Sequence, residues 1–294
     1  MELSIQNLSK TYSNGVKALQ DVTLTIPTGM FGLLGPNGAG KSSLMRTLAA
    51  LQDADSGTVT LGDIDVLNDK DAVRRVLGYL PQEFGIYPRI SAVDMLDHLA
   101  VLKGITNSSE RAKLVSALLE RVNLYDHRKK AVSSYSGGMR QRFGIAQALI
   151  GNPQLIIVDE PTAGLDPGER NRFYGLLSEI GENVIVILST HIVQDVKELC
   201  SNMAIINEGK LLFAGAPDAA LTMLEGKIWE RSINKSEMAH FQENYKIISN
   251  KLVAGKPNIH VYSETAPDGF VPTEANLEDV FFAKIFNVMN NDEL

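Results

Sequence analysis

The sequence predicts an α/β protein with a largely parallel β-sheet at its core, followed by a smaller α+β region. In the first two-thirds of the chain, apolar strand-like runs alternate with stretches of helical periodicity, the pattern of a sheet covered by helices. Leu155–Val158 and Val184–Ser189 are continuous apolar runs, typical of strands that are buried on both faces. Past about Gly226 this pattern ends, and shorter strand and helix signals follow.

The N-terminal segment is predicted to form an antiparallel unit in front of the parallel sheet. Its predicted strands are Leu3–Ile5, Lys10–Tyr12 and Ala18–Ile26. The Asn14-Gly15 pair between the last two strands is a turn signal. Met30–Leu34 is then a short apolar run that ends at a glycine-rich loop, and Lys41–Leu51 is predicted to be a helix.

Residues 83 to 152 are predicted to form a helical insertion. The segments with helical periodicity are Ala92–Lys103, Ser108–Val122 and Gly137–Ile150. No strong strand signal lies between them. The chain has 294 residues, enough for about two domains. We therefore expect a first domain at residues 1–225, with this helical subdomain inserted in it.

Residues 226–294 are predicted to form a small α+β domain. The expected elements are strands at Lys227–Ile233, Ile247–Val253 and Ile259–Tyr262, a helix at Ser236–Tyr245, and a helix after the candidate N-cap Asn276. This segment contains no recognisable catalytic constellation, and Trp229 and Phe281–Phe282 are expected in its core. We interpret it as a packing or dimer-stabilising unit rather than a ligand-sensing domain.

Composition restricts the possible partners. The net charge is −7, so the chain is a poor electrostatic partner for nucleic acid. The single cysteine, Cys200, excludes an intramolecular disulfide, and its helical spacing with Val196 indicates a buried face. The longest apolar runs are far shorter than the roughly 20 residues that cross a bilayer, so a role at a membrane is expected to need a partner. Arg74, Arg75, Arg140 and Arg142 are expected on ordinary solvated faces.

The glycine-rich loop has the pattern of a phosphate-binding loop. Gly35–Ser42 reads GPNGAGKS, which fits G-x-x-x-x-G-K-[ST] between a buried strand and a helix. Glycines let successive backbone N–H groups point at one phosphate, and the helix N-terminus adds a positive dipole end. Lys41 is expected to reach the β- and γ-phosphates, and the Ser42 hydroxyl to ligate Mg²⁺. A turn without a ligand is the alternative, but the complete match in this context favours nucleotide binding.

Polar residues follow several of the predicted strands. Asp159 and Glu160 follow the apolar run Leu155–Val158, at the edge of an open α/β sheet where ligands bind. Acids can simply mark the end of a strand, but a pair beside a phosphate loop favours Mg²⁺ binding by Asp159 and activation of water by Glu160. Gln82 and His191 also follow strands; taken singly, such residues are more often ordinary loop residues.

The order of these motifs resembles that of the nucleotide-binding subunit of ABC transporters, over roughly residues 1–225. The motifs are the phosphate loop, Gln82, Ser136 to Gly138, Asp159 with Glu160, Asp166 and His191. The resemblance implies the P-loop NTPase fold of ABC ATPases, which has a parallel-sheet core, an antiparallel β subdomain and a helical subdomain. It also implies an ATPase with ATP and Mg²⁺ as cofactors.

The resemblance assigns roles to individual residues. Tyr12 would stack on adenine, and the implied phosphate contacts are Gly35, Pro36, Asn37, Gly38, Ala39, Gly40, Lys41, Ser42 and Ser43. The implied Mg²⁺ ligands are Ser42, Gln82 and Asp159. The implied catalytic residues are Lys41, Gln82, Glu160 and His191.

The resemblance also implies partners. Two copies, or this chain and a paralogous subunit, would pair head to tail, so that Ser136, Gly137 and Gly138 act on the ATP of the other subunit. Asp166 would lie at this interface. The dimer would sit peripherally on the cytoplasmic face of the cell membrane, beneath a separate integral membrane permease that contacts the region around Glu83–Leu99. No nucleic acid partner is expected.

Two departures from the commonest signature, Leu-Ser-Gly-Gly-Gln, suggest a subclass. Tyr135 replaces the Leu and Met139 replaces the Gln. This form, together with Asn276–Phe281, is similar to that of ATPases serving type-2 exporters, so we expect export. The alternatives are a soluble ABC-type ATPase acting on ribosomes or DNA, and a small-molecule P-loop kinase, which would leave Ser136 to Gly138 and His191 without a role.

Overall fold

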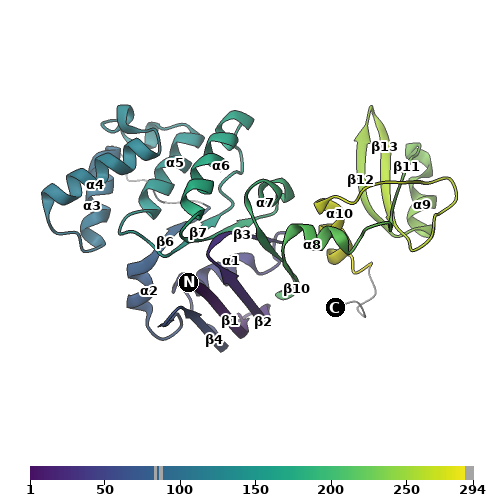
Figure 1. Ribbon diagram of the computed structural model, residues 1–294, viewed down its shortest axis with the longest axis horizontal. Helices are drawn as coiled ribbons and strands as arrows, with labels where there is room; N and C mark the ends of the chain where they lie inside the picture. The colour runs from purple at the N-terminus through teal and green to yellow at the C-terminus, as the bar shows by residue number, and fades with distance from the viewer. Residues whose placement is uncertain (83–84, 86–88, 289–294) are drawn as a thin grey trace.

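The structure, a computed structural model, describes residues 1–82, 85 and 89–288 (Figure 1). Within this part of the chain, the strands form a six-stranded sheet and two four-stranded sheets. The six-stranded sheet has the order β10-β9-β3-β8-β7-β6. Its strands are β3 (Gly29–Leu34), β6 (Leu77–Leu80), β7 (Leu155–Asp159), β8 (Ile185–Thr190), β9 (Asn202–Asn207) and β10 (Lys210–Gly215).

The six-stranded sheet is parallel except for its edge strand β10. β3 pairs in parallel with β8 and β9, and β7 pairs in parallel with β6 and β8. Every residue of β7 and β8 is buried, as their continuous apolar sequences predict. The predicted parallel core is confirmed. Because the strands are parallel, the loops that follow β3, β6, β7 and β8 leave from the same edge.

The N-terminal sheet is antiparallel, with the order β2-β1-β4-β5. Its strands are β1 (Glu2–Thr11), β2 (Lys17–Pro27), β4 (Ser56–Leu61) and β5 (Ile64–Asp65). The two predicted strands Leu3–Ile5 and Lys10–Tyr12 are parts of one strand, because β1 continues through a register shift between Ile5 and Leu8. Asn7 takes a left-handed φ of 51° within this shift, a conformation that asparagine tolerates better than most residues.

Helices separate the two sheets and cover the outer face of the parallel one (Figure 1). The helices up to residue 222 are α1 (Lys41–Leu48), α2 (Lys70–Val76), α3 (Ala92–Leu102), α4 (Ser108–Arg121), α5 (Gly137–Ala148), α6 (Pro167–Gly181), α7 (Val193–Leu199) and α8 (Pro217–Thr222). Leu44, Met45 and Leu48 of α1 share a buried cluster with residues of both neighbouring sheets. α3, α4 and α5 pack on one another and form the predicted helical insertion. No helix in the described ranges has the length and apolar character needed to cross a bilayer.

The C-terminal segment forms the third sheet, with the order β12-β13-β11-β14. Its elements are β11 (Ile228–Ser232), α9 (Met238–Asn244), β12 (Ile247–Val253), β13 (Lys256–Tyr262), β14 (Val271–Pro272) and α10 (Leu277–Ile285). Asn276 caps α10, as its sequence predicts, and forms a capping box with Asp279. Phe281 is buried, whereas Trp229 and Phe282 are half-buried, and the Trp229 Nε1 donates to the Ser263 carbonyl oxygen at 3.0 Å.

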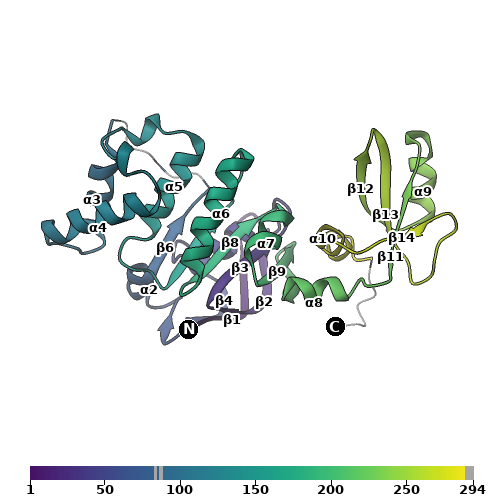
Figure 2. The ribbon, with the colours of Figure 1, turned by 45° about the horizontal axis from the view of Figure 1, so that its top comes forward.

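α10 joins the C-terminal sheet to the rest of the protein. It packs against β12 on one side and against α7, α8, β9 and β10 on the other. In both views α8 and α10 lie between the parallel sheet and the C-terminal strands (Figure 1 and Figure 2). Val280 and Phe281 belong to the same buried cluster as Val196 and Cys200. A division of the chain at residue 225 therefore stays a prediction, since one core cluster includes residues from both sides of it.

Candidate functional site

The loops at the shared edge of the parallel sheet bring the predicted catalytic residues together. Glu160, which directly follows β7, lies between Lys41 and His191. Its Oε1 atom is 3.7 Å from the Lys41 Nζ, and its Oε2 atom is 2.6 Å from the His191 Nδ1. Gln82 follows β6 at the same edge with an exposed side chain. The structure therefore places residues far apart in the sequence around one point.

The phosphate loop requires glycine for conformation and for space. Gly38 and Gly40 have left-handed φ angles of 82° and 109°. A Cβ atom on Gly40 would lie 2.4 Å from the Ala18 carbonyl oxygen, and one on Gly35 would lie 2.5 Å from the Ile206 carbonyl oxygen. Gly40 precedes α1, and no side chain caps the helix there. The N–H groups at the helix N-terminus can therefore donate hydrogen bonds to an anion. This cradle fits a phosphate group.

Lys41 is buried beneath the loop, with 5% of the side chain exposed. Its Nζ donates to the carbonyl oxygens of Gly35 and Pro36 at 2.6 and 3.2 Å. Burial lowers the pKa of the Lys41 ammonium group, and the carboxylates of Glu160 and Asp159 act in the opposite direction. The ammonium group is thus held at the base of the cradle by acceptors from its own chain.

The two acids at the end of β7 have different surroundings. Asp159 is 7% exposed, and burial raises the pKa of its carboxyl group. Glu160 has a left-handed φ of 48°, and its N–H donates to the Ser189 carbonyl oxygen at 2.9 Å. Such a conformation costs a non-glycine residue about 1–3 kcal/mol. The local turn that follows β7 holds Glu160 beside His191 in spite of this cost.

The oxygen donors at this edge fit Mg²⁺. The Ser42 hydroxyl is exposed at the start of α1, the Asp159 carboxylate ends β7, and the Gln82 amide follows β6. Magnesium prefers such hard oxygen ligands and usually takes only one or two protein carboxylates, with phosphate oxygens and water completing its shell. In the described ranges no group of three or more His, Cys, Asp or Glu residues could hold a metal ion.

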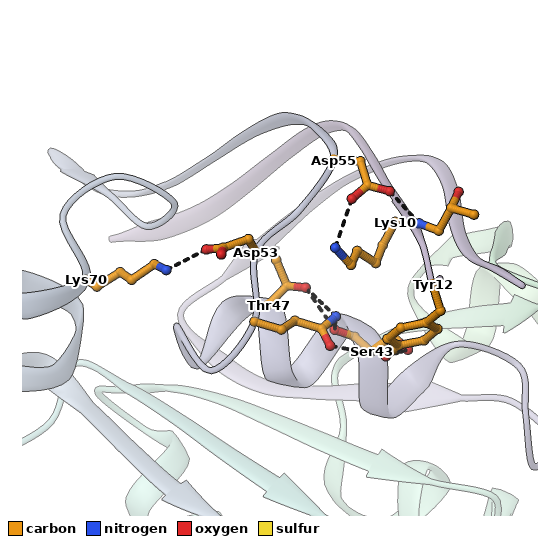
Figure 3. A network of polar contacts seen from close by, with 9 residues as sticks. Lys10, Tyr12, Ser43, Thr47, Asp53, Asp55 and Lys70 are labelled. Carbon is orange, nitrogen blue, oxygen red and sulfur yellow. Dashed lines mark hydrogen bonds and ion pairs between the residues drawn. The ribbon is translucent and has the colours of Figure 1, made fainter. Parts of the chain in front are cut away.

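Tyr12 is anchored behind the phosphate loop by its hydroxyl group (Figure 3). This group lies 2.9 Å from the Ser43 Oγ and 3.1 Å from the Gln52 Oε1. The Gln52 Nε2 in turn donates to the Ser43 carbonyl oxygen at 2.9 Å and to the Thr47 Oγ1 at 3.0 Å. The sequence pattern gives no signal for Gln52, because a single polar residue in a loop has no periodicity.

Two ion pairs hold the loop that contains Gln52 (Figure 3). Asp55 accepts from the Lys10 Nζ at 2.8 Å and from the Thr11 N–H at 2.6 Å. Asp53 pairs with Lys70 of α2. These contacts attach the loop to β1 and to α2. They thereby hold Gln52 in place as an acceptor for the Tyr12 hydroxyl.

The residues Ser136 to Gly138, called the signature loop below, lie on a different part of the fold, at the start of α5. Ser136 caps this helix, with its Oγ accepting from the Met139 N–H at 3.3 Å. Ser136 and Gly137 are exposed. Gly138 is buried against Glu169 of α6: a Cβ atom there would lie 2.4 Å from the Glu169 Oε2. Sequence reasoning gives no reason to select Glu169, which contacts the loop only because α5 and α6 pack together.

Arg142 does not lie on a solvated face, so the prediction for this residue is wrong. Its side chain is 13% exposed, and its Nη2 lies 3.5 Å from the Glu169 Oε2. Its Nη1 donates to the carbonyl oxygens of Val122 and Asn123, which directly follow α4. Asp166 caps α6 by accepting from the Glu169 N–H at 2.9 Å. Glu169 thus links the predicted interface loop to the signature helix.

Comparison with known proteins gives concordant results. A family model described as ABC transporter matches residues 19–163. "Probable multidrug ABC transporter ATP-binding protein YbhF" of Escherichia coli is 32% identical over 273 residues, covering 90% of this chain and 47% of YbhF. This chain thus spans about half the length of that relative. "Linearmycin resistance ATP-binding protein LnrL" of Bacillus subtilis is 33% identical over 227 residues, covering 76% of this chain and 72% of LnrL.

A solved structure agrees with these relatives. "Dimeric structure of a post-hydrolysis state of the ATP-binding cassette MJ0796 bound to ADP and Pi" superposes with a TM-score of 0.66 at 25% sequence identity, covering 73% of this chain and 98% of that chain. The fold of this chain is therefore that of an ATP-binding cassette. The chain therefore belongs to the ABC transporter family, and its relatives in that family are ATP-binding proteins.

Proposed function

We propose that this chain is the ATPase subunit of an ABC exporter, and that two copies close around two MgATP molecules. The observation that carries the proposal is the contact of Glu160 with both Lys41 and His191 beside the phosphate loop. An acid, a buried lysine and a histidine at the mouth of an anion cradle suit phosphoryl transfer to water better than simple nucleotide storage.

Each residue has a definite task in this proposal. The loop N–H groups and Lys41 hold the β- and γ-phosphates, and Ser42, Gln82 and Asp159 hold Mg²⁺, which neutralises phosphate charge when bound. Glu160 orients the attacking water and accepts a proton from it. His191 holds the Glu160 carboxylate from its other side at 2.6 Å. Tyr12 provides the ring on which adenine stacks.

Dimerisation is supported by the signature loop. Ser136 and Gly137 are exposed at the N-terminus of α5, whose positive dipole end favours an anion. The MJ0796 cassette is dimeric in its solved structure, and we extend that arrangement to this chain. Each signature loop would then face the ATP held by the other copy. A paralogous subunit could take the place of the second copy.

Export through a separate membrane permease is the finer part of the proposal. YbhF and LnrL are named for multidrug transport and for linearmycin resistance, which supports outward movement. Tyr135 and Met139 in the signature, and the Asn276–Phe281 segment, support the same subclass. The chain would lie on the cytoplasmic face of the membrane. The proposed permease contact around Glu83–Leu99 includes residues 83–84 and 86–88, which lie outside the described residues.

Replacement of Glu160 by glutamine tests the ATPase assignment. We expect Glu160→Gln to keep MgATP binding and to lower the turnover number about 100-fold or more, because the amide cannot accept the proton of the water. MgATP should then drive a stable dimer, measured by light scattering. Glu182→Gln, an exposed change just after α6, is the matched control and should leave turnover unchanged. Normal turnover in Glu160→Gln would contradict the role of Glu160.

The membrane partner needs a separate test. A tagged full-length chain should co-purify with an integral membrane protein from detergent-solubilised membranes. Co-purification with ribosomes or DNA in place of a membrane protein would overturn the transport proposal and leave the ATPase assignment intact. Uptake of a candidate cargo into inverted vesicles, driven by ATP, would establish the direction of transport.

A further inference from the structure

A carboxylate outside the described catalytic contacts is completely buried and accepts hydrogen bonds from hydroxyl groups. Asp195, in the first turn of α7, is 0% exposed. Its Oδ2 accepts from the Thr162 Oγ1 at 2.6 Å and from the Thr190 Oγ1 at 2.9 Å. Its Oδ1 accepts from the Tyr174 hydroxyl at 2.5 Å. A fully buried acid that lacks a catalytic contact calls for an explanation.

Two of the three donors lie close to catalytic residues, one in the loop after β7 and the other at the end of β8. Thr162 comes two positions after Glu160, and Thr190 immediately precedes His191. Thr190 also accepts from the Ile192 N–H at 2.9 Å, so its hydroxyl fixes the backbone just beyond His191. The third donor, Tyr174, comes from α6, which lies beside α7 over the parallel sheet (Figure 2). One carboxylate therefore bridges the loop after β7 and the end of β8, where the loop that carries His191 begins.

The three hydrogen bonds to Asp195 are strong because the acceptor is a carboxylate that is shielded from water. Removing a carboxylate from water costs several kcal/mol unless donors replace the lost water. Within the described part of the chain no lysine or arginine forms an ion pair with Asp195. The donors that replace the lost water are three hydroxyl groups. A hydrogen bond to a charged group contributes more to stability than one between neutral groups. Burial and the Asp195 carboxylate raise the pKa of Tyr174, which keeps that hydroxyl a donor.

We propose that Asp195 is a positioning residue for ATP hydrolysis, which holds the Glu160 loop and the His191 loop in one register. This inference rests on the proposed function. Asp195 touches neither Glu160 nor His191, and acts through Thr162 and Thr190. Without the hydrogen bonds to Asp195, the two loops could move apart, and the 2.6 Å contact between Glu160 and His191 would no longer be maintained. The effect should appear in turnover rather than in nucleotide affinity.

Two variants that preserve shape test the proposal. In Asp195→Asn the side chain loses its charge and one of its two acceptor atoms becomes a donor, so the hydrogen bonds from the two threonine hydroxyls weaken and the one from the Tyr174 hydroxyl must reverse or break. Thr190→Val removes one donor at nearly constant volume. We expect each to lower the kcat for MgATP hydrolysis by the full chain about 10-fold or more, because small misplacements of reacting groups have large effects on rate. The KM for MgATP and the affinity for a non-hydrolysable ATP analogue should change less than about threefold.

Tyr174→Phe is the matched control. It removes a hydrogen bond to the same buried carboxylate, but leaves both loops attached. Its thermal stability should fall about as much as that of Thr190→Val, whereas its kcat should stay within about twofold of the wild-type value. The kcat of Asp195→Glu should be lower than that of the wild type and higher than that of Asp195→Asn.

The outcomes are distinct. If Tyr174→Phe and Thr190→Val lower kcat equally, Asp195 serves the general fold and the positioning role is wrong. If Thr190→Val retains a normal kcat, the proposal is also wrong, even where Asp195→Asn fails to fold. Failure of the proposed function would give a different result, since Glu160→Gln would then hydrolyse ATP normally. A turnover defect in Asp195→Asn with an additive, rather than shared, defect in the Asp195→Asn and Thr190→Val double variant would likewise contradict action through Thr190.

Discussion

Two glycine-containing loops open onto helices in this protein, and they use glycine for different reasons. In the phosphate loop, Gly38 and Gly40 adopt left-handed conformations, and backbone atoms approach too closely for a side chain at Gly40. In the signature loop, Gly137 and Gly138 lie within α5 and do not have positive φ angles. Glycine is therefore required by the backbone in the first loop, but not in the second.

The two loops also differ in the side chains that surround them. The phosphate loop has Lys41 beneath it and Glu160 beside it. At Gly137 an added Cβ atom would meet nothing within 4 Å, so no described neighbour explains the absence of a side chain. A ligand approaching from a second chain would explain it. The open surface at Gly137 suits the shared site proposed above.

The largest expected effects come from disabling each loop separately. Lys41→Ala should weaken MgATP binding by the monomer about 100-fold or more, because it removes a buried charge that faces phosphate. Ser136→Arg should leave monomer binding intact and block both dimer closure and hydrolysis, since its side chain would fill the surface next to the partner. Binding of a fluorescent ATP analogue and light scattering separate the two results. Normal hydrolysis by Ser136→Arg would show that the signature loop has no part in a shared site.

A smaller and sharper effect is expected from the two signature glycines. Gly137→Ala has open space and a better helix former, so its melting temperature should be unchanged or slightly higher. Gly138→Ala meets Glu169 and should lose about 1–3 kcal/mol of unfolding free energy. The Glu169→Ala background should relieve most of that loss. Both glycine variants should hydrolyse ATP more slowly; full activity in Gly137→Ala would mean that the bare helix end has no ligand.

The smallest effects concern the tyrosine behind each loop. The Tyr12 hydroxyl supports Ser43, whereas the Tyr135 hydroxyl donates to the His127 carbonyl oxygen at 3.0 Å inside the helical insertion. Tyr12→Phe should weaken ATP binding by about 1 kcal/mol and keep ring stacking. Tyr135→Phe should lower the unfolding free energy by a similar amount and leave ATP affinity unchanged. Calorimetry of binding and of unfolding distinguishes the two, and a reversal of the pattern would contradict the separation of the loops.

The sequence predicts the parts of this molecule that follow a local rule. Buried strands have continuous apolar runs, and strands in parallel order bring their following loops to one edge, so Asp159, Glu160 and His191 could be grouped before the structure was known. The phosphate loop follows from a complete local motif. The large helical insertion follows from periodicity.

Contacts between elements far apart in the sequence could not be predicted. Asp195, Glu169 and Gln52 are single polar residues whose partners lie on other elements, and no periodic pattern selects them. Arg142 has the appearance of a surface residue until α5 is packed against α6 and the end of α4. The strands β9 and β10 were also missed, because Met203–Ile206 is a short apolar stretch bounded by asparagines.

The position of α10 has a consequence for how the chain folds during synthesis. Val196 of α7 and Cys200, which directly follows α7, pack in a cluster with Val280 and Phe281, which leave the ribosome much later. Until then, the apolar side of α7 has no final cover, although its helix directly follows the loop that carries His191. A newly made cassette would expose this face to chaperones or to other nascent chains, and it would reach its finished form only when the last helix docks.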